Sequence, residues 1–170
     1  MRSAIAFLAC AVILGLVNYS IGAKERQLAS GKVVYLELAP IDPRSLMQGD
    51  FMALRFKIAN DARPAMNRSG VDRWGRAAAL AAADGRIVAH VDPASVATFR
   101  RLDDGTPLGS NEIALRYRVR AGEIKFATNA YFFEEGTDKR YEGARYGEFR
   151  VSPEGELLLT GLRGKELQAL

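Results

Sequence analysis

The feature that most constrains the fold of this sequence is an apolar segment near the N-terminus, residues 4–22 (AIAFLACAVILGLVNYSIG). It contains no charged residue, and its few polar side chains lie close to its end. A helix needs about 20 apolar residues to cross a bilayer, and a helix satisfies its own backbone there. We therefore expect a single N-terminal transmembrane helix, with residues 1–26 forming a signal anchor and stalk and residues 27–170 forming a separate domain.

The residues around this segment indicate whether it is removed. Arg2 supplies a basic start and Ala23 fits a cleavage site, but Ile21 stands where a small residue is wanted. We therefore expect an uncleaved signal anchor, with a cleaved signal peptide as the alternative. Cys10 is expected to be a free thiol in the helix, because the apolar run continues past it.

The charges on the two sides of the segment nearly balance. Arg2 on one side faces Lys24 and Arg26 on the other, and Glu25 offsets one of these. Translocation of the domain is the usual outcome after a single N-terminal apolar segment. We therefore expect the domain to lie outside the cytoplasm.

Composition excludes several classes of function for residues 27–170. The single cysteine is Cys10, so the domain holds neither a disulfide nor a thiolate metal site. The 24 basic residues of the whole chain are scattered among its 20 acidic ones without a dense basic run, which argues against nucleic-acid binding. His90 is the only histidine, and one histidine does not supply a typical metal site. No cofactor is expected.

Turn signals at short intervals predict a mainly β domain, an antiparallel sandwich or open barrel with one short helix. These signals lie at residues 83–85, 93–95, 103–105, 121–122 and 153–155. The segments around them are rich in β-branched and apolar residues, and we expect strands at residues 33–38, 76–83, 86–91, 96–102, 113–119, 123–127, 147–151 and 157–162.

Three further segments complete the expected fold. Residues 51–58 alternate as a strand does, which predicts that one set of side chains faces the core: Met52, Leu54, Phe56 and Ile58. Residues 60–75 are polar and are expected to form a long loop that carries the only tryptophan, Trp74. Residues 133–144 are expected to form the short helix.

Residues 49–56 read Gly-Asp-Phe-Met-Ala-Leu-Arg-Phe. This octapeptide is similar to the signature Gly-Asp-Tyr-x-x-Leu-x-Tyr of the GDYxxLxY family, and four other segments resemble further blocks of that family: residues 36–48, 99–105, 115–119 and 144–151. The resemblance covers nearly the whole chain. It implies a single-pass protein of the bacterial inner membrane with a mostly β domain facing the periplasm or exterior, and it implies no particular reaction.

The sequence departs from the signature at both tyrosines, which are Phe51 and Phe56 here. A phenol that served as acid, base or nucleophile is not replaceable by phenylalanine. We therefore expect these two rings to serve packing rather than catalysis.

Charged side chains before and within the signature suggest a binding site. Asp42, Arg44, Asp50 and Arg55 are expected to form a charged rim around residues 40–48. This rim would make a pocket if Arg145 and Tyr146 fold beside it. These six residues are the candidate binding site, and no catalytic or metal-binding residue is expected.

The expected function is that of a non-catalytic accessory or interaction subunit in a membrane protein complex. Members of the resembled family occur beside multi-spanning membrane proteins, which implies such a partner. Residues 40–48 and the signature strand are expected to supply the contact surface.

Two alternatives stay open. The order of Ser45, the Gly49-Asp50 turn and a strand resembles the type I signal peptidases, so a serine hydrolase centred on Ser45 is one alternative. It requires a lysine base, and the strand that would carry it holds arginine instead at residues 116, 118 and 120. Lys32, Lys57 or Lys125 would have to replace it. The other alternative is an envelope glycan-binding or lipid-binding module, in which Trp74 or Tyr146 would line a groove.

Four carboxylates occur close together within the expected short helix: Glu134, Glu135, Asp138 and Glu142. Neighbouring Lys139 and Arg140 would neutralise them at helical spacing. We expect a solvated, salt-linked helix, with a cation or substrate site as the less favoured interpretation.

Overall fold

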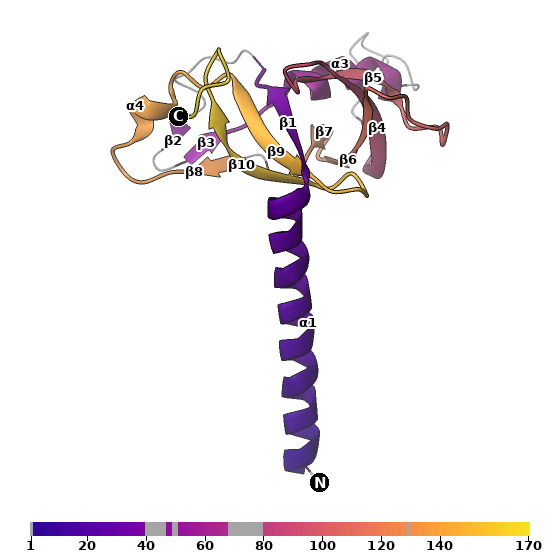
Figure 1. Cartoon of the computed structure of the whole chain (residues 1–170), viewed down its shortest axis with the longest axis vertical. Coiled ribbons are helices and arrows are strands. Elements are labelled where there is room, and N and C mark those ends of the chain that lie inside the picture. Colours follow the sequence, from indigo (N-terminus) through magenta and orange to yellow (C-terminus); the bar gives the residue numbers. More distant parts are fainter. Residues whose placement is uncertain (1, 40–46, 49–50, 68–79, 129) are drawn as a thin grey trace.

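The computed structural model describes residues 2–39, 47–48, 51–67, 80–128 and 130–170. Its elements follow in the order α1 (Arg2–Ser30), β1 (Lys32–Glu37), β2 (Met47–Gln48), β3 (Phe51–Ala53), α3 (Lys57–Met66), β4 (Ala83–Val91), β5 (Ala97–Leu102), β6 (Glu112–Arg120), β7 (Glu123–Lys125), β8 (Ala130–Phe132), α4 (Asp138–Tyr141), β9 (Tyr146–Val151) and β10 (Leu157–Arg163). Figure 1 shows α1 as a long rod that leaves the β-rich domain at one end.

The helix α1 is 29 residues long and contains the expected apolar segment. Within residues 7–30, an 18-residue window has a mean hydropathy of 1.6, and the domain buries none of that window. By length and composition α1 is therefore able to cross a membrane. The expected domain boundary at residue 26 lies inside α1, which continues without a break to Ser30.

The strands form three small antiparallel sheets, which together make a half-barrel. The first sheet has the order β1-β9-β10, the second β2-β3-β8, and the third β5-β4-β6-β7. The mainly β, antiparallel fold expected from the turn signals is thus confirmed.

Main-chain hydrogen bonds join the three sheets. Tyr35 of β1 donates to the carbonyl of Ser95 at 2.9 Å, and Arg116 of β6 donates to the carbonyl of Gly155 at 2.8 Å. These two bonds attach the first sheet to the third at two places. A bridge between Leu38 and Phe56 attaches the first sheet to the chain that follows β3.

The core lies between the sheets and includes three side chains of the signature, Met52, Leu54 and Phe56. Met52, Leu54, Phe56 and Ile58 are all buried, as their alternation predicts. The ring of Phe56 packs edge-on against Phe149, with 5.4 Å between the ring centroids. The expected packing role is therefore confirmed for Phe56.

The signature strand is shorter than expected, and the first part of the expected loop is helical. The strand predicted for residues 51–58 ends at Ala53, and the helix α3 begins at Lys57 and extends to Met66, into the expected loop 60–75. Ile58 and Ala62 are buried one helical turn apart, and Lys57 forms an ion pair of 3.0 Å with Asp61. This i, i+4 spacing stabilises a helix. Trp74 lies outside the described residues.

The turn expected at residues 83–85 is wrong, because β4 runs straight through these residues. Asp84 and Gly85 pair with Arg118 and Tyr117 of β6. A Cβ atom at Gly85 would lie 2.7 Å from the Tyr117 hydroxyl oxygen, so this glycine permits a close approach inside a strand.

Three of the other four expected turns are found where the sequence predicts them. Residues 121–122 connect β6 to β7, residues 153–155 connect β9 to β10, and the turn at residues 93–95 lies between β4 and β5. Residues 103–105 instead begin a longer loop between β5 and β6, which pair with β4 and not with each other. The expected helix at residues 133–144 is shorter, since α4 spans only Asp138–Tyr141.

Candidate functional site

The end of α1 is bonded directly to the first sheet. Gln27 is only 7% exposed, and its side-chain amide donates to the main-chain carbonyls of Arg150 at 3.0 Å and Glu156 at 2.8 Å. A buried polar side chain needs such partners, because an unpaired one costs about 1–3 kcal/mol. We call this contact between Gln27 and the β9–β10 hairpin the helix junction.

Gly31 lets the chain turn from α1 into β1 at this junction. Its amide donates to the carbonyl of Gln27 at 2.9 Å and ends the helix. A Cβ atom here would lie 2.4 Å from that carbonyl oxygen and 3.2 Å from the carbonyl oxygen of Val151. The close packing of helix end against β9 therefore depends on a glycine.

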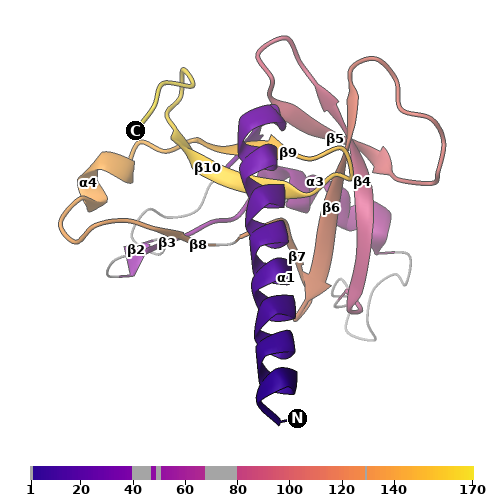
Figure 2. The same ribbon diagram turned by 60° about the horizontal axis from the view of Figure 1, so that its bottom comes forward.

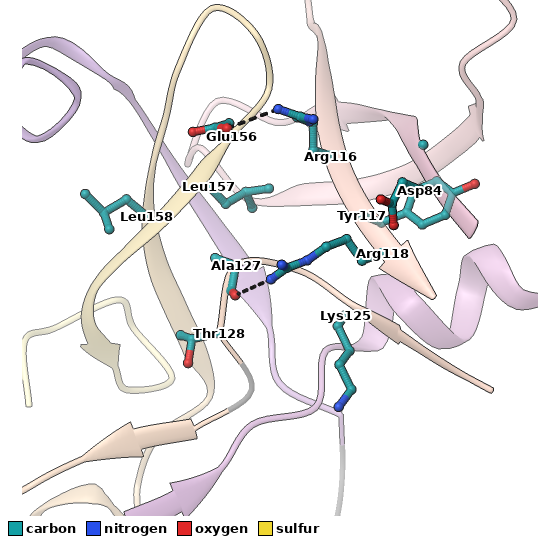
Figure 3. Close-up of a pocket in the computed structure, with 11 residues that line it drawn as sticks. Asp84, Arg116, Tyr117, Arg118, Lys125, Ala127, Thr128, Glu156, Leu157 and Leu158 are labelled. Atoms are coloured by element: carbon teal, nitrogen blue, oxygen red, sulfur yellow. Dashed lines mark hydrogen bonds and ion pairs between the residues drawn. The ribbon is translucent and has the colours of Figure 1, made fainter. Parts of the chain in front are cut away.

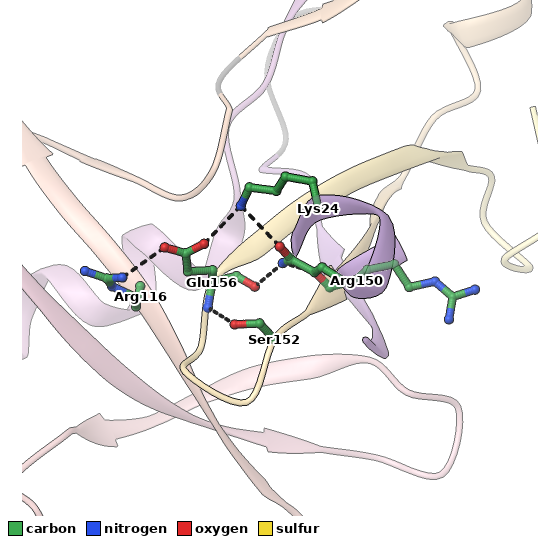
Figure 4. A network of polar contacts seen from close by, with 6 residues as sticks. Lys24, Arg116, Arg150, Ser152 and Glu156 are labelled. Atoms are coloured by element: carbon green, nitrogen blue, oxygen red, sulfur yellow. Dashed lines mark hydrogen bonds and ion pairs between the residues drawn. The ribbon is translucent and has the colours of Figure 1, made fainter. Parts of the chain in front are cut away.

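An ion-pair network surrounds the helix junction, as Figure 4 shows. Lys24 of α1 and Arg116 of β6 each lie 3.0 Å from a carboxylate oxygen of Glu156. The hydrogen bond from Lys24 holds the pKa of Glu156 below its ordinary value, and the charge of Arg116 acts in the same direction. Glu156 thus links α1, the β9–β10 hairpin and β6.

The hairpin turn that presents Glu156 is held by its own hydrogen bonds. Ser152 donates its amide to the Glu156 carbonyl at 2.9 Å, and its hydroxyl oxygen accepts from the Glu156 amide at 3.2 Å. Gly155 has a φ of 84°, and a Cβ atom there would lie 2.7 Å from the carbonyl oxygen of Ala114. The turn therefore fits closely against β6.

A cavity of about 560 Å³ opens beside this network, between β6, β7 and the start of β10. Figure 3 shows Arg116 and Arg118 extending from β6 toward β10. The residues around the cavity combine cationic and apolar groups: Asp84, Gly85, Arg116, Tyr117, Arg118, Lys125, Ala127, Thr128, Glu156, Leu157 and Leu158.

Cations around the cavity outnumber the carboxylates that are available to them. Asp84 is already paired with Arg120 at 2.7 Å, and this hydrogen bond lowers the pKa of Asp84. Glu156 is paired as described above. Within the described residues, Arg118 and Lys125 have no ion pair, and Arg118 donates only to the Ala127 carbonyl, at 3.3 Å. The cavity therefore has an excess of positive charge.

Three residues of the expected binding site are described. Arg55 is exposed and lies 3.5 Å from the carboxylate of Glu123. Arg145 is exposed, and Tyr146 is half-buried at the start of β9. The other three, Asp42, Arg44 and Asp50, lie outside the described residues.

The structure brings the main chains of Arg55 and Arg145 to opposite sides of one short segment. The amide of Leu38 donates to the carbonyl of Arg145 at 2.8 Å, and the amide of Ala39 donates to the carbonyl of Arg55 at 2.7 Å. Successive amides of an extended chain point in opposite directions. The segment Leu38–Ala39 therefore lies between the main chains of Arg55 and Arg145.

The other residues considered in the sequence occupy ordinary positions or are not described. His90 is exposed on β4. Within the ranges that the structure describes, no group of three or more His, Cys, Asp or Glu side chains is placed to hold a metal ion. Ser45 lies outside the described residues, as does Trp74.

The helix junction and the cavity were not expected from the sequence. A signal for the cavity exists in the β6 sequence, where Arg116, Arg118 and Arg120 recur at every second position and are all exposed. This period places three cations on one face of a strand. No comparable signal marks the contact of Gln27 with Glu156, because the two residues lie on distant parts of the chain.

Comparison with known proteins gives one match. A family model described as GDYXXLXY protein matches residues 13–162, and this is the family that the octapeptide resembles. Searches of curated proteins and of solved structures find no match.

Proposed function

The chain belongs to the GDYXXLXY family, and we propose that it is a membrane-anchored, non-catalytic subunit that contacts a multi-spanning membrane protein. Its N-terminal apolar helix fits membrane anchoring. In this proposal the helix stays uncleaved in a bacterial inner membrane, and the domain faces the periplasm or exterior.

The observation that carries the proposal is the helix junction. Buried Gln27 bonds the end of α1 to two carbonyls of the β9–β10 hairpin. A domain attached in this way has one orientation relative to its membrane helix, whereas a domain on a flexible linker samples many. A fixed orientation suits a protein that binds a neighbour in the same membrane, because it presents the same face to that neighbour and lowers the entropic cost of binding.

The proposed contact surface is the outer face of the sheet β2-β3-β8. Phe132 of β8 is 75% exposed, and its ring packs against Phe51 of the signature, with 5.8 Å between centroids. The neighbouring residues Met52 and Tyr131 face the core instead. Exposed aromatic side chains are enriched at protein interfaces. The six residues of the expected binding site, which include Asp42, Arg44 and Asp50, would extend this surface.

The test is purification of the full-length protein from gently solubilised membranes of its host, followed by mass spectrometry. Phe132→Ser is compared with Leu108→Ser, which removes another exposed apolar side chain, on the loop between β5 and β6. We expect a stoichiometric multi-spanning protein with the wild type and the Leu108 variant, and its loss with the Phe132 variant. A wild-type protein that purifies alone would contradict the proposal.

A further inference from the structure

The cationic cavity lies next to the end of the membrane helix. Lys24 lies two residues after the apolar segment 4–22, and its amine lies 3.0 Å from the carboxylate of Glu156, which lines the cavity. Figures 1 and 2 both place the β9–β10 turn beside the domain end of α1. If α1 crosses the bilayer, Lys24 lies at the end of the hydrocarbon span. The polar headgroup layer on each side is about 5–8 Å deep, so the edge of the cavity at Glu156 lies at that layer.

The cavity has two kinds of lining. Arg118 and Lys125 provide positive charge that no carboxylate of the described residues neutralises by an ion pair. Leu157 of β10 provides an apolar side chain on the opposite wall, whereas the side chain of Leu158 points away, as Figure 3 shows. A site with unpaired cations on one side and an apolar side chain on the other suits an amphipathic anion. Its volume of about 560 Å³ is within the range of about 300–1,000 Å³ that small-molecule sites occupy.

We propose that this cavity binds the phosphate group of an anionic phospholipid in the leaflet next to the domain, and that Arg118 and Lys125 contact this phosphate. A guanidinium offers two parallel N–H donors to phosphate oxygens, and an ammonium adds a point charge. Leu157 contacts the glycerol and the first methylenes of the acyl chains. The inference rests on the proposed membrane anchoring, and the bound lipid is a second attachment of the domain to the bilayer.

The experiment titrates full-length protein in neutral detergent with phosphatidylglycerol or phosphatidylcholine and follows the midpoint of thermal unfolding. The pocket variant is Arg118→Gln with Lys125→Gln. The matched control is Arg100→Gln with Lys165→Gln, since Arg100 and Lys165 are exposed and do not line the cavity. Lys125→Met, which keeps an apolar stem, replaces the pocket variant if the double substitution prevents folding.

We expect phosphatidylglycerol to raise the unfolding midpoint of the wild type and the control, and phosphatidylcholine to raise it less. Each lost cation weakens the apparent affinity for phosphatidylglycerol about fivefold, which corresponds to about 1 kcal/mol per cation near an anionic surface. An equal response of pocket variant and control would overturn the proposal, as would an equal response to the two lipids.

Two further experiments distinguish a lipid from a soluble phosphate ester, and a failure of the cavity proposal from a failure of the membrane anchoring. Glycerophosphoglycerol, the same headgroup without acyl chains, is expected to have no effect at the lipid concentration used; equal stabilisation would identify a soluble phosphate ester as the ligand and overturn the lipid assignment. Extraction of host membranes with alkaline carbonate tests the anchor separately. A protein that stays in the membrane but shows no lipid preference refutes the cavity proposal alone, whereas a protein that is washed off refutes the anchoring.

Discussion

The side-chain amide of Gln27 donates a hydrogen bond of 2.8 Å to the main-chain carbonyl of Glu156. A second hydrogen bond from the same amide group, to Arg150, is 3.0 Å long. The two bonds connect the end of the apolar helix to β9 and to the β9–β10 turn, near the C-terminus. The α1 helix is therefore part of the folded domain at its C-terminal end, and its apolar length projects from that domain.

Replacing Gln27 with leucine is expected to destabilise the folded protein by about 1–3 kcal/mol, because the variant loses two part-buried hydrogen bonds, each worth about 0.5–1.5 kcal/mol. Chemical denaturation of the full-length protein in detergent measures the change. Lys24→Gln is the comparison: its ion pair with Glu156 joins side chains that are 51% and 45% exposed. Such a pair contributes at most about 1 kcal/mol. Equal effects of the two substitutions would refute the junction as the main attachment.

The pH dependence of stability should report on Glu156. Its pKa is lowered in the folded protein, chiefly by the hydrogen bond from Lys24. A lowered carboxyl pKa contributes stability that is present above the ordinary value of 4.5 and is lost as the pH falls through the folded value. We expect Glu156→Gln to be less stable than the wild type at pH 7, by less than about 1 kcal/mol because the pair is exposed. The difference should vanish at about pH 2; a constant difference would contradict the assignment.

The two signature phenylalanines should respond differently when each is changed to the tyrosine of the family signature. Phe56 is 4% exposed, so the hydroxyl of Phe56→Tyr enters the core and is expected to cost about 1–3 kcal/mol unless it finds a partner. Phe51 is half-buried beside exposed Phe132, so Phe51→Tyr should change stability by less than about 0.5 kcal/mol. Unfolding free energies measure both, and the reverse order would contradict the packing described here.

Two glycines have nearly the same φ but different surroundings, so alanine substitutions at them distinguish the cost of backbone strain from the cost of steric crowding. Gly105 has a φ of 83° and nothing within 4 Å of a Cβ position, whereas Gly155 has a φ of 84° and a carbonyl oxygen at 2.7 Å. Gly105→Ala should therefore cost only the left-handed backbone penalty, about 1–2 kcal/mol. Gly155→Ala should cost clearly more, because the β9–β10 turn must move away from β6. Thermal unfolding of the two variants compares these costs, and similar values would show that the turn is loosely packed.

Local sequence patterns predicted much of this fold. The apolar run predicted α1, and alternation predicted which signature side chains enter the core, because both patterns depend only on neighbouring residues. The failures arose where one pattern fits two structures. Ile58 continues the two-residue period of the signature strand, yet with Ala62 it also begins the apolar face of α3. Asp84-Gly85 has the composition of a turn, but its glycine accommodates the ring of Tyr117.

The candidate site was less predictable than the fold. Arg116 and Arg118 share one face of β6, and the alternation within this strand could have shown it. Their position beside Leu157 and near the apolar helix α1 depends on long-range pairing that no local pattern contains. The same holds for Gln27, whose burial follows from the approach of a hairpin that forms far along the chain. Of the expected site residues, Arg55 and Arg145 are close in the main chain, and their role in partner binding remains a prediction.

The most direct test of the account is the distribution of distances between the membrane helix and the domain. The single cysteine, Cys10, is exposed on α1, and a second cysteine at exposed Thr98 of β5 provides a partner for spin labels. Double electron–electron resonance on the labelled full-length protein in lipid nanodiscs gives the distribution. The account predicts one narrow distribution that broadens when Gln27 is changed to leucine. A broad distribution in the protein with intact Gln27 would contradict the claim that the helix junction fixes the domain relative to its membrane helix.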